Sequence, residues 1–492
     1  MTGPAKTLML QGTGSDVGKS LLVAGMARAY TSRGLNVRPF KPQNMSNNAA
    51  VTADGGEIGR AQALQARACG VAASIHMNPV LLKPQSDKGA QVVVRGRVFA
   101  NANARDYHEM KPKLMEKVLG SFHHMTDEGD LVLVEGAGSP AEINLRAGDI
   151  ANMGFALAAQ VPVFLVADID RGGAIASIVG THALLDDDER ALISGFIINK
   201  FRGDKTLLQP ALDEIEARTG FLCAGVVPWF EDAWILPSED AVALQRQAMP
   251  KKNGAINVIV PQLPRIANFD DLDPLVAEED VNVRFIQPGE TIPANADVVI
   301  LPGSKSTLDD LKNVRASGWD VDILAHSRRG GIVVGLCAGF QMLGQTIADR
   351  FGREGAASGP VPGLSLLDID TEISDTKALG HVQGTHCASG TKISGYEMHM
   401  GVTQGDGLAR SMLLLDDDRP DGAVSASGLT MGCYVHGLFS SDTFRSFFLD
   451  QLRQGRLPGE AHEARVEATL DSLARHIETN MDLDALLNVA RA

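Results

Sequence analysis

Short apolar runs alternate with longer amphipathic stretches along most of the chain. Thr7–Gln11, Leu131–Val134 and Val161–Ala167 are rich in aliphatic and β-branched residues and are typical of buried strands. Residues 20–32 instead repeat their apolar positions at helical spacing. Because strands of this kind alternate with helices, we expect an α/β fold, built on mostly parallel sheets with helices on both faces.

The alternation is interrupted once, which divides the chain. Residues 237–254 lose their periodicity and become polar, and a second strand-and-helix series begins at residue 255. With 492 residues the chain is long enough for two or three domains. We therefore expect a first domain over 1–236, a linker over 237–254, a second domain over 255–445 and a helical tail over 446–492. Around the start of this tail, Phe444, Phe447, Phe448 and Leu452 are spaced as one buried stripe.

The first strand leads into a glycine-rich loop and then into a helix, which is the arrangement of a phosphate-binding loop. Thr13 stands where the usual pattern has its first glycine, and Gly12 lies one residue earlier. Backbone N–H groups of such a loop hold phosphate oxygens, the lysine reaches the terminal phosphates, and the hydroxyl after it can bind Mg²⁺. The loop predicts ATP binding through Gly12, Thr13, Gly14, Asp16, Val17, Gly18, Lys19 and Ser20.

Polar side chains follow several later strands, at the sheet edge where ligands bind in α/β proteins. Glu135 ends an apolar run in the manner of a metal-side carboxylate. Asp54 is a second candidate magnesium ligand and Glu57 a candidate cleft residue, although both also fit as solvated loop carboxylates. Asn199 ends a strand where an amide can read an adenine edge.

Cys337 lies in Gly335-Leu336-Cys337-Ala338-Gly339, between an apolar strand pattern and a helical one. A thiol at a helix N-terminus is biased towards the thiolate, and the glycines allow a sharp turn and the close approach of a substrate. This pattern predicts a nucleophile. The alternative is a buried structural cysteine in an α/β core.

A cysteine nucleophile needs a base within hydrogen-bonding reach, often with a third group that orients the base. His399 and His436 both lie downstream in strand–loop contexts, and their spacing alone does not separate them. We favour His436, which has glycines on both sides near the end of an apolar segment, and take His399 as a structural or substrate-side residue. The turn Pro302-Gly303-Ser304-Lys305 could supply oxyanion-binding N–H groups.

Composition excludes several other classes of function. A net charge of −15 argues against non-specific binding to nucleic acids or anionic membranes. The sequence has neither a long apolar run nor a signal-peptide pattern, so we expect a cytoplasmic protein without membrane association. Its five cysteines lack CxxC spacing, which indicates neither a disulfide framework nor a zinc site.

Two family resemblances follow from these motifs. The cysteine elbow, the downstream histidine and the Pro-Gly-Ser turn resemble class I, triad-type glutamine amidotransferases, which have a flavodoxin-like fold. The phosphate loop, Lys41-Pro42 and Val134-Glu135-Gly136-Ala137-Gly138 resemble dethiobiotin synthetase. The whole chain resembles the cobyric acid synthase family most specifically, through 41–46 (KPQNMS), 57–62 (EIGRAQ), 168–173 (DIDRGG) and 199–204 (NKFRGD).

The resemblance implies a concrete reaction. Cys337 and His436 would release ammonia from glutamine, and ATP with Mg²⁺ would activate a carboxylate of a corrinoid, adenosylcobyrinic acid a,c-diamide. Ammonia would then displace phosphate, at the b, d, e and g side chains in turn. Lys19 and Lys41 would neutralise the phosphoryl group, with Ser20, Asp54 and Glu135 around the metal. The resemblance leaves room for a homo-oligomer.

One position departs from the triad pattern. These glutaminases normally carry a carboxylate two residues after the histidine, and this sequence has Leu438 there. Either the site works as a dyad or another acid orients His436, for which Glu397 is a candidate. The alternatives for the whole chain are a cobyrinic acid a,c-diamide synthase, another glutamine-dependent ligase, or a non-enzymatic P-loop switch. A DNA-partitioning ATPase is disfavoured by the acidic charge and by the absence of a second lysine in the loop.

Overall fold

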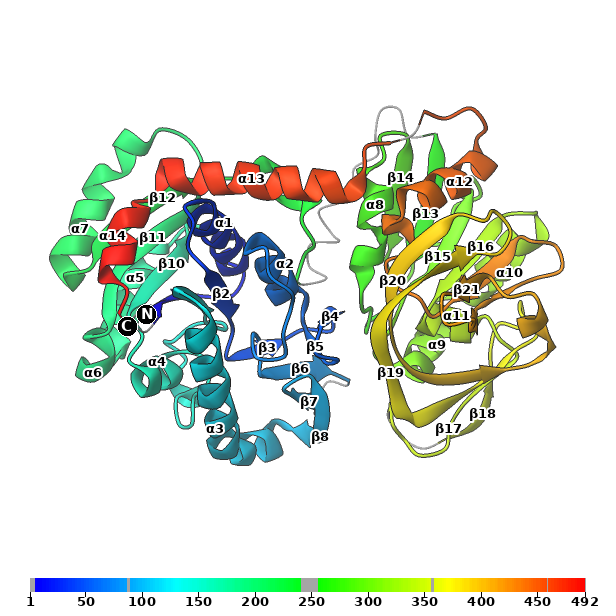
Figure 1. Cartoon of the computed structure of the whole chain (residues 1–492), viewed down its shortest axis with the longest axis horizontal. Helices are drawn as coiled ribbons and strands as arrows, with labels where there is room; N and C mark the ends of the chain where they lie inside the picture. Colours follow the sequence, from blue (N-terminus) through cyan, green and yellow to red (C-terminus); the bar gives the residue numbers. More distant parts are fainter. Residues whose placement is uncertain (1–4, 86–88, 240–254, 355–357, 458, 492) are drawn as a thin grey trace.

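The computed structural model describes residues 5–85, 89–239, 255–354, 358–457 and 459–491. Two α/β halves lie side by side, and a long C-terminal helix runs back over the first (Figure 1). In the described residues, no helix combines the length and the apolar character needed to span a membrane.

The first half is built on a six-stranded sheet in which every neighbouring pair is parallel. Its order is β12-β11-β10-β1-β9-β2, so β1, which leads into the glycine-rich loop, is central. The strands are β1 (Lys6–Gly12), β2 (Val37–Phe40), β9 (Leu131–Glu135), β10 (Val163–Asp168), β11 (Ile193–Phe201) and β12 (Leu222–Pro228).

Helices cover both faces of this sheet, as the alternation of residues in its strands requires. Leu8 and Leu10 of β1 belong to one buried cluster, which includes α1, whereas Met9 belongs to the cluster on the other face. The helices are α1 (Lys19–Ser32), α2 (Arg60–Ala68), α3 (Ala104–Glu128), α4 (Met153–Ala159), α5 (Ala174–Leu184), α6 (Asp187–Arg190) and α7 (Gln209–Thr219). The predicted mostly parallel α/β sheet is thus confirmed.

A small second sheet stands on the first half where the sequence suggested only polar loops. It has the order β3-β6-β7-β8, with β3 (Gln43–Met45), β6 (Val80–Pro84), β7 (Gly89–Val94) and β8 (Arg97–Asn103). A short antiparallel pair, β4 (Ala49–Val51) and β5 (Glu57–Gly59), lies beside it. Among these strands, β3, β4 and β5 have only three residues each, which leaves too little periodicity to be read from a sequence.

The second half has the strand order of a flavodoxin-like sheet, β14-β13-β15-β16-β24, extended at one edge by β23. All pairs are parallel except β23 with β24. Its strands are β13 (Ile256–Pro261), β14 (Val281–Ile286), β15 (Val298–Leu301), β16 (Ile332–Leu336), β23 (Ala423–Val424) and β24 (Thr430–Cys433). The helices are α8 (Asp273–Ala277), α9 (Thr307–Ala316), α10 (Trp319–Arg328) and α11 (Ala338–Met342).

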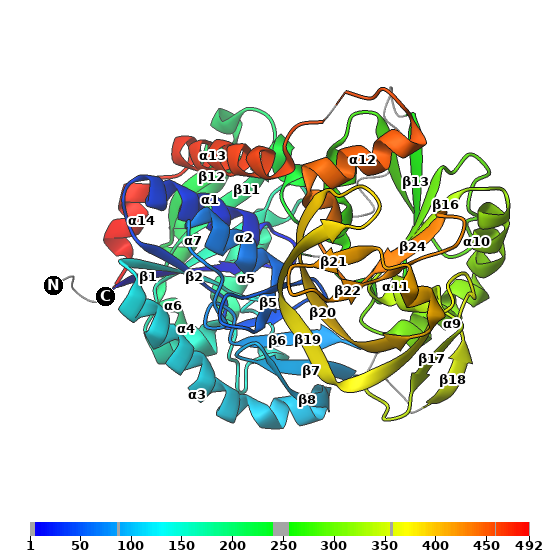
Figure 2. The same ribbon diagram turned by 45° about the vertical axis from the view of Figure 1, so that its right-hand side comes forward.

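A further sheet of the second half faces the small sheet of the first (Figure 2). Its long strands β19 (Asp370–His386) and β20 (Lys392–Gln404) pair antiparallel. Tyr396 and Met398 of β20 share a buried apolar cluster with Ala49, Leu81 and Val93 of the first half. The other strands of this sheet are β17 (Thr346–Asp349), β18 (Ser358–Pro362), β21 (Leu413–Leu415) and β22 (Pro420–Asp421).

The C-terminal helices divide between the two halves. The boundary expected after residue 445 falls inside α12 (Asp442–Leu452), whose Phe444 and Phe448 are buried in the core of the second half. α13 (His462–Asn480) and α14 (Leu483–Val489) instead pack on the first half, where Leu473 and Ile477 lie against Gly25 of α1. The two described ends also meet, since Thr7 and Arg491 form an antiparallel bridge.

Candidate active sites

The glycine-rich loop joins β1 to α1 through backbone positions that a side chain would disturb. A Cβ on Gly12 would lie 2.8 Å from Lys19 Nζ, and Gly18 has φ +92° at the start of α1. Asn199 Nδ2 donates to the carbonyl of Val17 at 2.8 Å. Asn199 of β11 therefore holds the loop in place, and the N-terminal end of α1 faces an open cavity.

That cavity brings together most of the predicted nucleotide-binding side chains. It is lined by Asp16, Gly18, Lys19, Ser20, Lys41 and Glu135, together with Glu239, which the sequence did not single out. Thr13 lies on the other side of the loop, where its N–H donates to Val166 O of the neighbouring strand, and Val17 is buried. Gly14 lines a second cavity that extends along the same loop.

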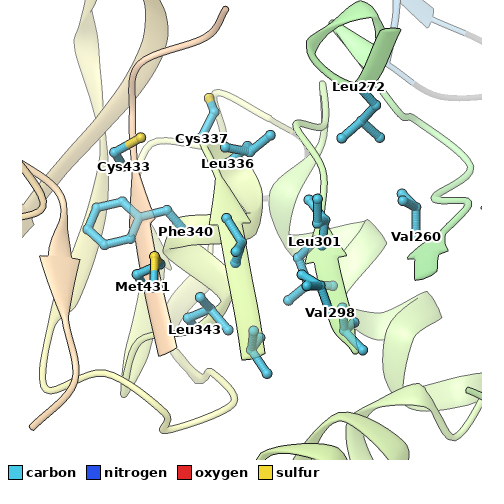
Figure 3. Packing of buried hydrophobic residues seen from close by; sticks show 14 of the residues in the cluster. Val260, Leu272, Val298, Leu301, Leu336, Cys337, Phe340, Leu343, Met431 and Cys433 are labelled. Carbon is cyan, nitrogen blue, oxygen red and sulfur yellow. The ribbon is translucent and has the colours of Figure 1, made fainter. Parts of the chain in front are cut away.

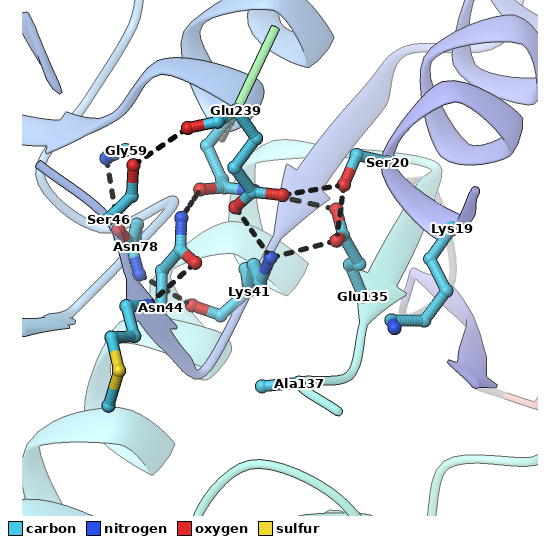
Figure 4. A network of polar contacts seen from close by, with 12 residues as sticks. Lys19, Ser20, Lys41, Asn44, Ser46, Gly59, Asn78, Glu135, Ala137 and Glu239 are labelled. Carbon is cyan, nitrogen blue, oxygen red and sulfur yellow. Dashed lines mark hydrogen bonds and ion pairs between the residues drawn. The ribbon is translucent and has the colours of Figure 1, made fainter. Parts of the chain in front are cut away.

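Ser20, Lys41, Glu135 and Glu239 form one polar cluster (Figure 4). Lys41 Nζ lies 2.8 Å from both Glu135 Oε1 and Glu239 Oε1. Ser20 Oγ lies 2.7 Å from Glu135 and 2.9 Å from Glu239. These hydroxyl and carboxylate oxygens are the donor type that Mg²⁺ prefers.

Charge explains how this cluster tolerates burial. Burial alone would lower the pKa of Lys41, but the two carboxylates raise it above its usual value, so the ammonium is retained. Burial likewise lowers the pKa of Lys19, which lies near the same carboxylates and whose Nζ lies 3.5 Å from Gly138 O. Lys19 is thus the cation that gains most from an incoming phosphate.

Glu239 reaches the cluster from the segment expected to be a linker. Its backbone carbonyl accepts from Ser46 Oγ at 2.9 Å, and that of Ser238 accepts from Asn48 Nδ2 at 3.0 Å. The rest of the expected linker, residues 240–254, lies outside the described residues. No sequence pattern marks Glu239, because only the tertiary fold brings it to Ser20, 219 positions away.

One sequence expectation needs correction here. Asp54 does not join the cluster, since its carboxylate accepts from Ser74 Oγ at 2.8 Å and from Ile75 N in a separate turn. Asn199 uses one amide N–H on Val17, which leaves its second N–H and its oxygen for a ligand. Asn199 does line an adjoining cavity with aromatic walls, formed by Trp229, Phe230, Trp234 and, from α13, His476.

The second site lies at the carboxyl end of β16, where Cys337 forms a sharp turn before α11 (Figure 3). Cys337 has φ +50°, a strained value for a non-glycine residue. Glycines on both sides are required, because a Cβ on Gly339 would lie 2.0 Å from Leu301 O and one on Gly335 would lie 2.6 Å from Phe340 N. Cys337 is 7% exposed and lines a cavity together with His436.

His436 is held by a carboxylate that sequence spacing did not reveal. Its Nδ1 lies 2.6 Å from Asp271 Oδ2, and the other oxygen of Asp271 accepts from Gly437 N at 2.7 Å. This leaves the second ring nitrogen for the thiol. Burial opposes charging of His436, but Asp271 and Cys337 raise its pKa to about 10, which favours the charged imidazolium.

Asp271 takes the place of the carboxylate missing at position 438 and of Glu397, the orienting acid considered from the sequence. Leu438 is buried apolar core, as its side chain implies. Glu397 is directed elsewhere, since both its oxygens accept from Arg419, at 2.7 and 2.6 Å. The expectation that Glu397 orients His436 is therefore wrong. Asp271 lies in a 3-10 helix (Phe269–Leu272) before α8, 165 positions from His436, and its only sequence signal is an acid-rich loop after a strand.

The other residues predicted for this site lie around the Cys337–His436 pair. His399 stacks on Tyr434 with ring centroids 3.7 Å apart, and its Nδ1 lies 3.0 Å from Gly401 O. Gly303 lines the cavity beside Ala338, whereas the N–H of Lys305 donates to Arg265 O and cannot bind an oxyanion.

Residues of the first half complete the surroundings of Cys337. Asn47 and Lys83 line its cavity, and Lys83 pairs with buried Glu57 at 2.8 Å. Arg60, at the start of α2, pairs with Asp270 at 3.0 Å and donates to Tyr396 OH, while the Tyr396 ring stacks on His436. The thiol site is thus built at the interface between the halves. Within the described residues, no cluster of three or more His, Cys, Asp or Glu side chains suits a metal ion.

Comparison with known proteins identifies both halves. Residues 8–242 match the CobQ/CobB/MinD/ParA nucleotide binding domain, and residues 257–444 match the CobB/CobQ-like glutamine amidotransferase domain. The chain is therefore a nucleotide-binding domain joined to a glutamine amidotransferase domain.

Relatives over the full length define the family. The chain is 59% identical to the cobyric acid synthase of Methylorubrum populi over 99% of both chains. It is 57% identical to that of Cereibacter sphaeroides strain ATCC 17023, over 98% of this chain and 99% of the relative. The chain belongs to the cobyric acid synthase family and is an ATP-dependent, glutamine-using ligase, which rules out a non-enzymatic P-loop switch.

Proposed function

We propose that this enzyme amidates the b, d, e and g carboxylates of adenosylcobyrinic acid a,c-diamide to give adenosylcobyric acid. The observation that carries the proposal is the presence, in one chain, of two groups of side chains that suit the two half-reactions. A phosphate loop faces the Ser20, Lys41, Glu135 and Glu239 cluster, and a Cys–His–Asp arrangement lies at the domain interface. The choice of substrate is supported by the full-length relatives, which are named cobyric acid synthase.

At the thiol site, the Cys337 thiolate attacks the side-chain amide of glutamine. The N–H groups of Gly303 and Ala338 stabilise the oxyanion, and His436 gives its proton to the departing ammonia. Water then attacks the thioester, with His436 as the base, and glutamate leaves. Asp271 keeps His436 in one orientation and stabilises its charged form in both steps.

At the phosphate loop, a corrinoid carboxylate attacks the terminal phosphate of ATP, which makes an acyl phosphate and ADP. Ammonia attacks the acyl carbon and expels phosphate, leaving the amide. Activation is needed because the oxide of a carboxylate does not leave. Lys19 and Lys41 offset the charge that develops on the phosphoryl oxygens. Ser20, Glu135 and Glu239 offer the oxygens that would hold Mg²⁺, which when bound neutralises phosphate charge.

Product analysis by mass spectrometry tests this function. Purified enzyme receives ATP, Mg²⁺ and glutamine with either cobyrinic acid or adenosylcobyrinic acid a,c-diamide. We expect the a,c-diamide to gain four amides. Amidation of cobyrinic acid at the a and c positions alone would instead identify a cobyrinic acid a,c-diamide synthase, and conversion of neither would place the substrate outside the corrinoids.

A further inference from the structure

Two further cavities adjoin the nucleotide cavity, one at each end of the phosphate loop. The cavity with aromatic walls, here called the aromatic cavity, shares with it Gly18, Leu21, Lys200, Ala233 and Ser238. The cavity that Gly14 lines, here called the side cavity, shares with it Ser15, Gln43, Ala137 and Gly138. The nucleotide cavity thus extends in two directions.

The walls and the loop suit these two extensions to different parts of the reaction. The planar apolar walls of the aromatic cavity, Trp229, Phe230 and Trp234, suit a nucleoside base. Lys19, the lysine that reaches the terminal phosphate, lies 3.5 Å from the carbonyl of Gly138, on the side-cavity end. In phosphoryl transfer the attacking oxygen approaches opposite to the leaving group. With the base in the aromatic cavity, the attacking carboxylate therefore comes from the side cavity.

The side cavity offers a cation and an amide to an anionic ligand. Half-buried Lys111 of α3 lines it, and within the described residues its ammonium forms no ion pair. Lys111 Nζ lies 5.9 Å from the centre of the Tyr107 ring. The hydroxyl of Tyr107 donates to Gln43 Oε1 at 2.5 Å, which fixes the Gln43 side chain and leaves its amide N–H groups for a ligand.

The other charged side chains on this wall differ from Lys111 in having partners or in being exposed. Arg146 Nε pairs with Glu189 Oε1 at 2.8 Å. Asp149 accepts from three backbone N–H groups around the start of α4, which offset its charge. Glu142 also lines the cavity and is exposed to solvent. Lys111 is therefore the group on this wall that gains most from a ligand carboxylate.

Large apolar side chains are exposed next to these polar groups. Leu145 lines the side cavity and Met45 lines the nucleotide cavity, and each is 56% exposed. Ile143, in the same 3-10 helix as Leu145 (Ile143–Leu145), is exposed to the same extent. Exposed apolar groups at a cavity indicate a ligand with an apolar body. Together with Lys111 they fit a macrocycle that carries carboxylates on its rim.

We propose that the side cavity binds the corrinoid, with Leu145 against its macrocycle and Lys111 paired with a carboxylate other than the one being activated. The reacting carboxylate then passes Gln43 and Gly138 and meets the terminal phosphate held by Lys19. This inference rests on the proposed function and adds to it the subsite that holds the acceptor.

The first test compares K111M, K111R and the matched control K113M. Lys113 is an exposed lysine of the same helix and lies outside the residues that line these three cavities. Steady-state amidation is driven by ammonium chloride, so that the thiol site takes no part. We expect K111M to raise the KM for adenosylcobyrinic acid a,c-diamide about tenfold, the effect of one charge-assisted hydrogen bond. K111R should recover part of this loss, K113M should match wild type, and the KM for ATP should not change.

The second test adds a charge to the apolar wall. L145D places a carboxylate beside the proposed position of a polyanionic ligand, and it should raise the same KM by repulsion. The matched control is L207D, since Leu207 is 80% exposed in a separate 3-10 helix (Lys205–Leu208). Both leucines are exposed, so neither substitution should prevent folding.

Three results would overturn the corrinoid subsite. One is an unchanged KM for the corrinoid in both K111M and L145D. Another is a rise in the KM for ATP that equals the rise for the corrinoid, because the effect would then not be confined to the acceptor. The third is a K111R variant as weak as K111M, which would show that Lys111 does not act through its charge. If wild type itself amidates no corrinoid, the proposed function fails instead, and the two failures are thereby distinguished.

Discussion

His436 Nδ1 lies 2.6 Å from Asp271 Oδ2, although 165 positions separate the two residues. The carboxylate of this triad therefore comes from before the cysteine, not from the segment that carries the histidine. We predict that D271N loses glutaminase activity on the order of 10²–10⁴-fold, because the imidazole loses its orienting acceptor. Amidation driven by ammonium chloride should persist.

The control for this prediction is E397Q. Glu397 pairs with Arg419 rather than with His436, so its glutaminase rate should stay close to that of wild type. A large loss in E397Q with little loss in D271N would return the orienting role to Glu397.

The same pair predicts a pH-dependent stability. The pKa of His436 is about 10 in the folded protein, above its ordinary value of 6.5. Protonated His436 therefore contributes stability that is complete below pH 6.5 and is lost as the pH rises through 10. Thermal unfolding should show wild type more stable than D271N at pH 6.5, with the difference shrinking towards pH 10. A difference that grows with pH would contradict the raised pKa of His436.

Arg60 is expected to support the glutaminase from the nucleotide-binding half. It pairs with Asp270 and donates to Tyr396, which stacks on His436. R60M leaves Asp270 as an unpaired buried charge, a change that typically costs about 3–5 kcal/mol. We expect a lower stability to urea and a reduced glutaminase kcat. R67M, in the same helix but partnered by exposed Glu463 and Glu467 of α13, should change the kcat little. Equal effects of the two variants would show that Arg60 has no particular link to the thiol site.

Glu239 should matter for nucleotide binding and not for glutamine hydrolysis. It shares Ser20 and Lys41 with Glu135, so E239Q removes one of two carboxylates from the proposed magnesium position. We predict that ATP affinity, measured by calorimetry across a range of Mg²⁺ concentrations, becomes weaker and needs more Mg²⁺. D54N, in a separate turn, should leave it unchanged. The reverse result would restore Asp54 to the metal site.

The sequence was informative where local pattern determines structure. The central strands, the glycine-rich loop and the Cys337 elbow depend on periodicity and on glycines close together in the chain, and the parallel pairing of the main sheets followed from strand–helix alternation. The roles of Asp271 and Glu239 were not predicted, because only tertiary packing brings these residues to His436 and Ser20. The prediction for Asp54 was wrong for the same reason, since a polar loop after a strand does not specify which way its carboxylate faces.

The C-terminal helices show the limit most clearly. The apolar stripe that includes Phe444 and Phe448 predicted burial, and these two side chains lie in the core of the second half. The packing of α13 on α1 was not predicted, because the two helices lie more than 400 positions apart, as in the pairing of Arg28 with Glu467. Amphipathic spacing predicts that one face of a helix is buried, but it does not predict which element covers that face.

The most direct test of the central claim is the fate of amide-¹⁵N glutamine in the complete reaction. With ATP, Mg²⁺ and adenosylcobyrinic acid a,c-diamide, we predict a product that carries four new amides, each labelled with ¹⁵N. C337A should form no labelled amide from glutamine and should still amidate with ¹⁵N ammonium chloride. A product with fewer new amides at completion, or labelled amides formed by C337A from glutamine, would contradict it.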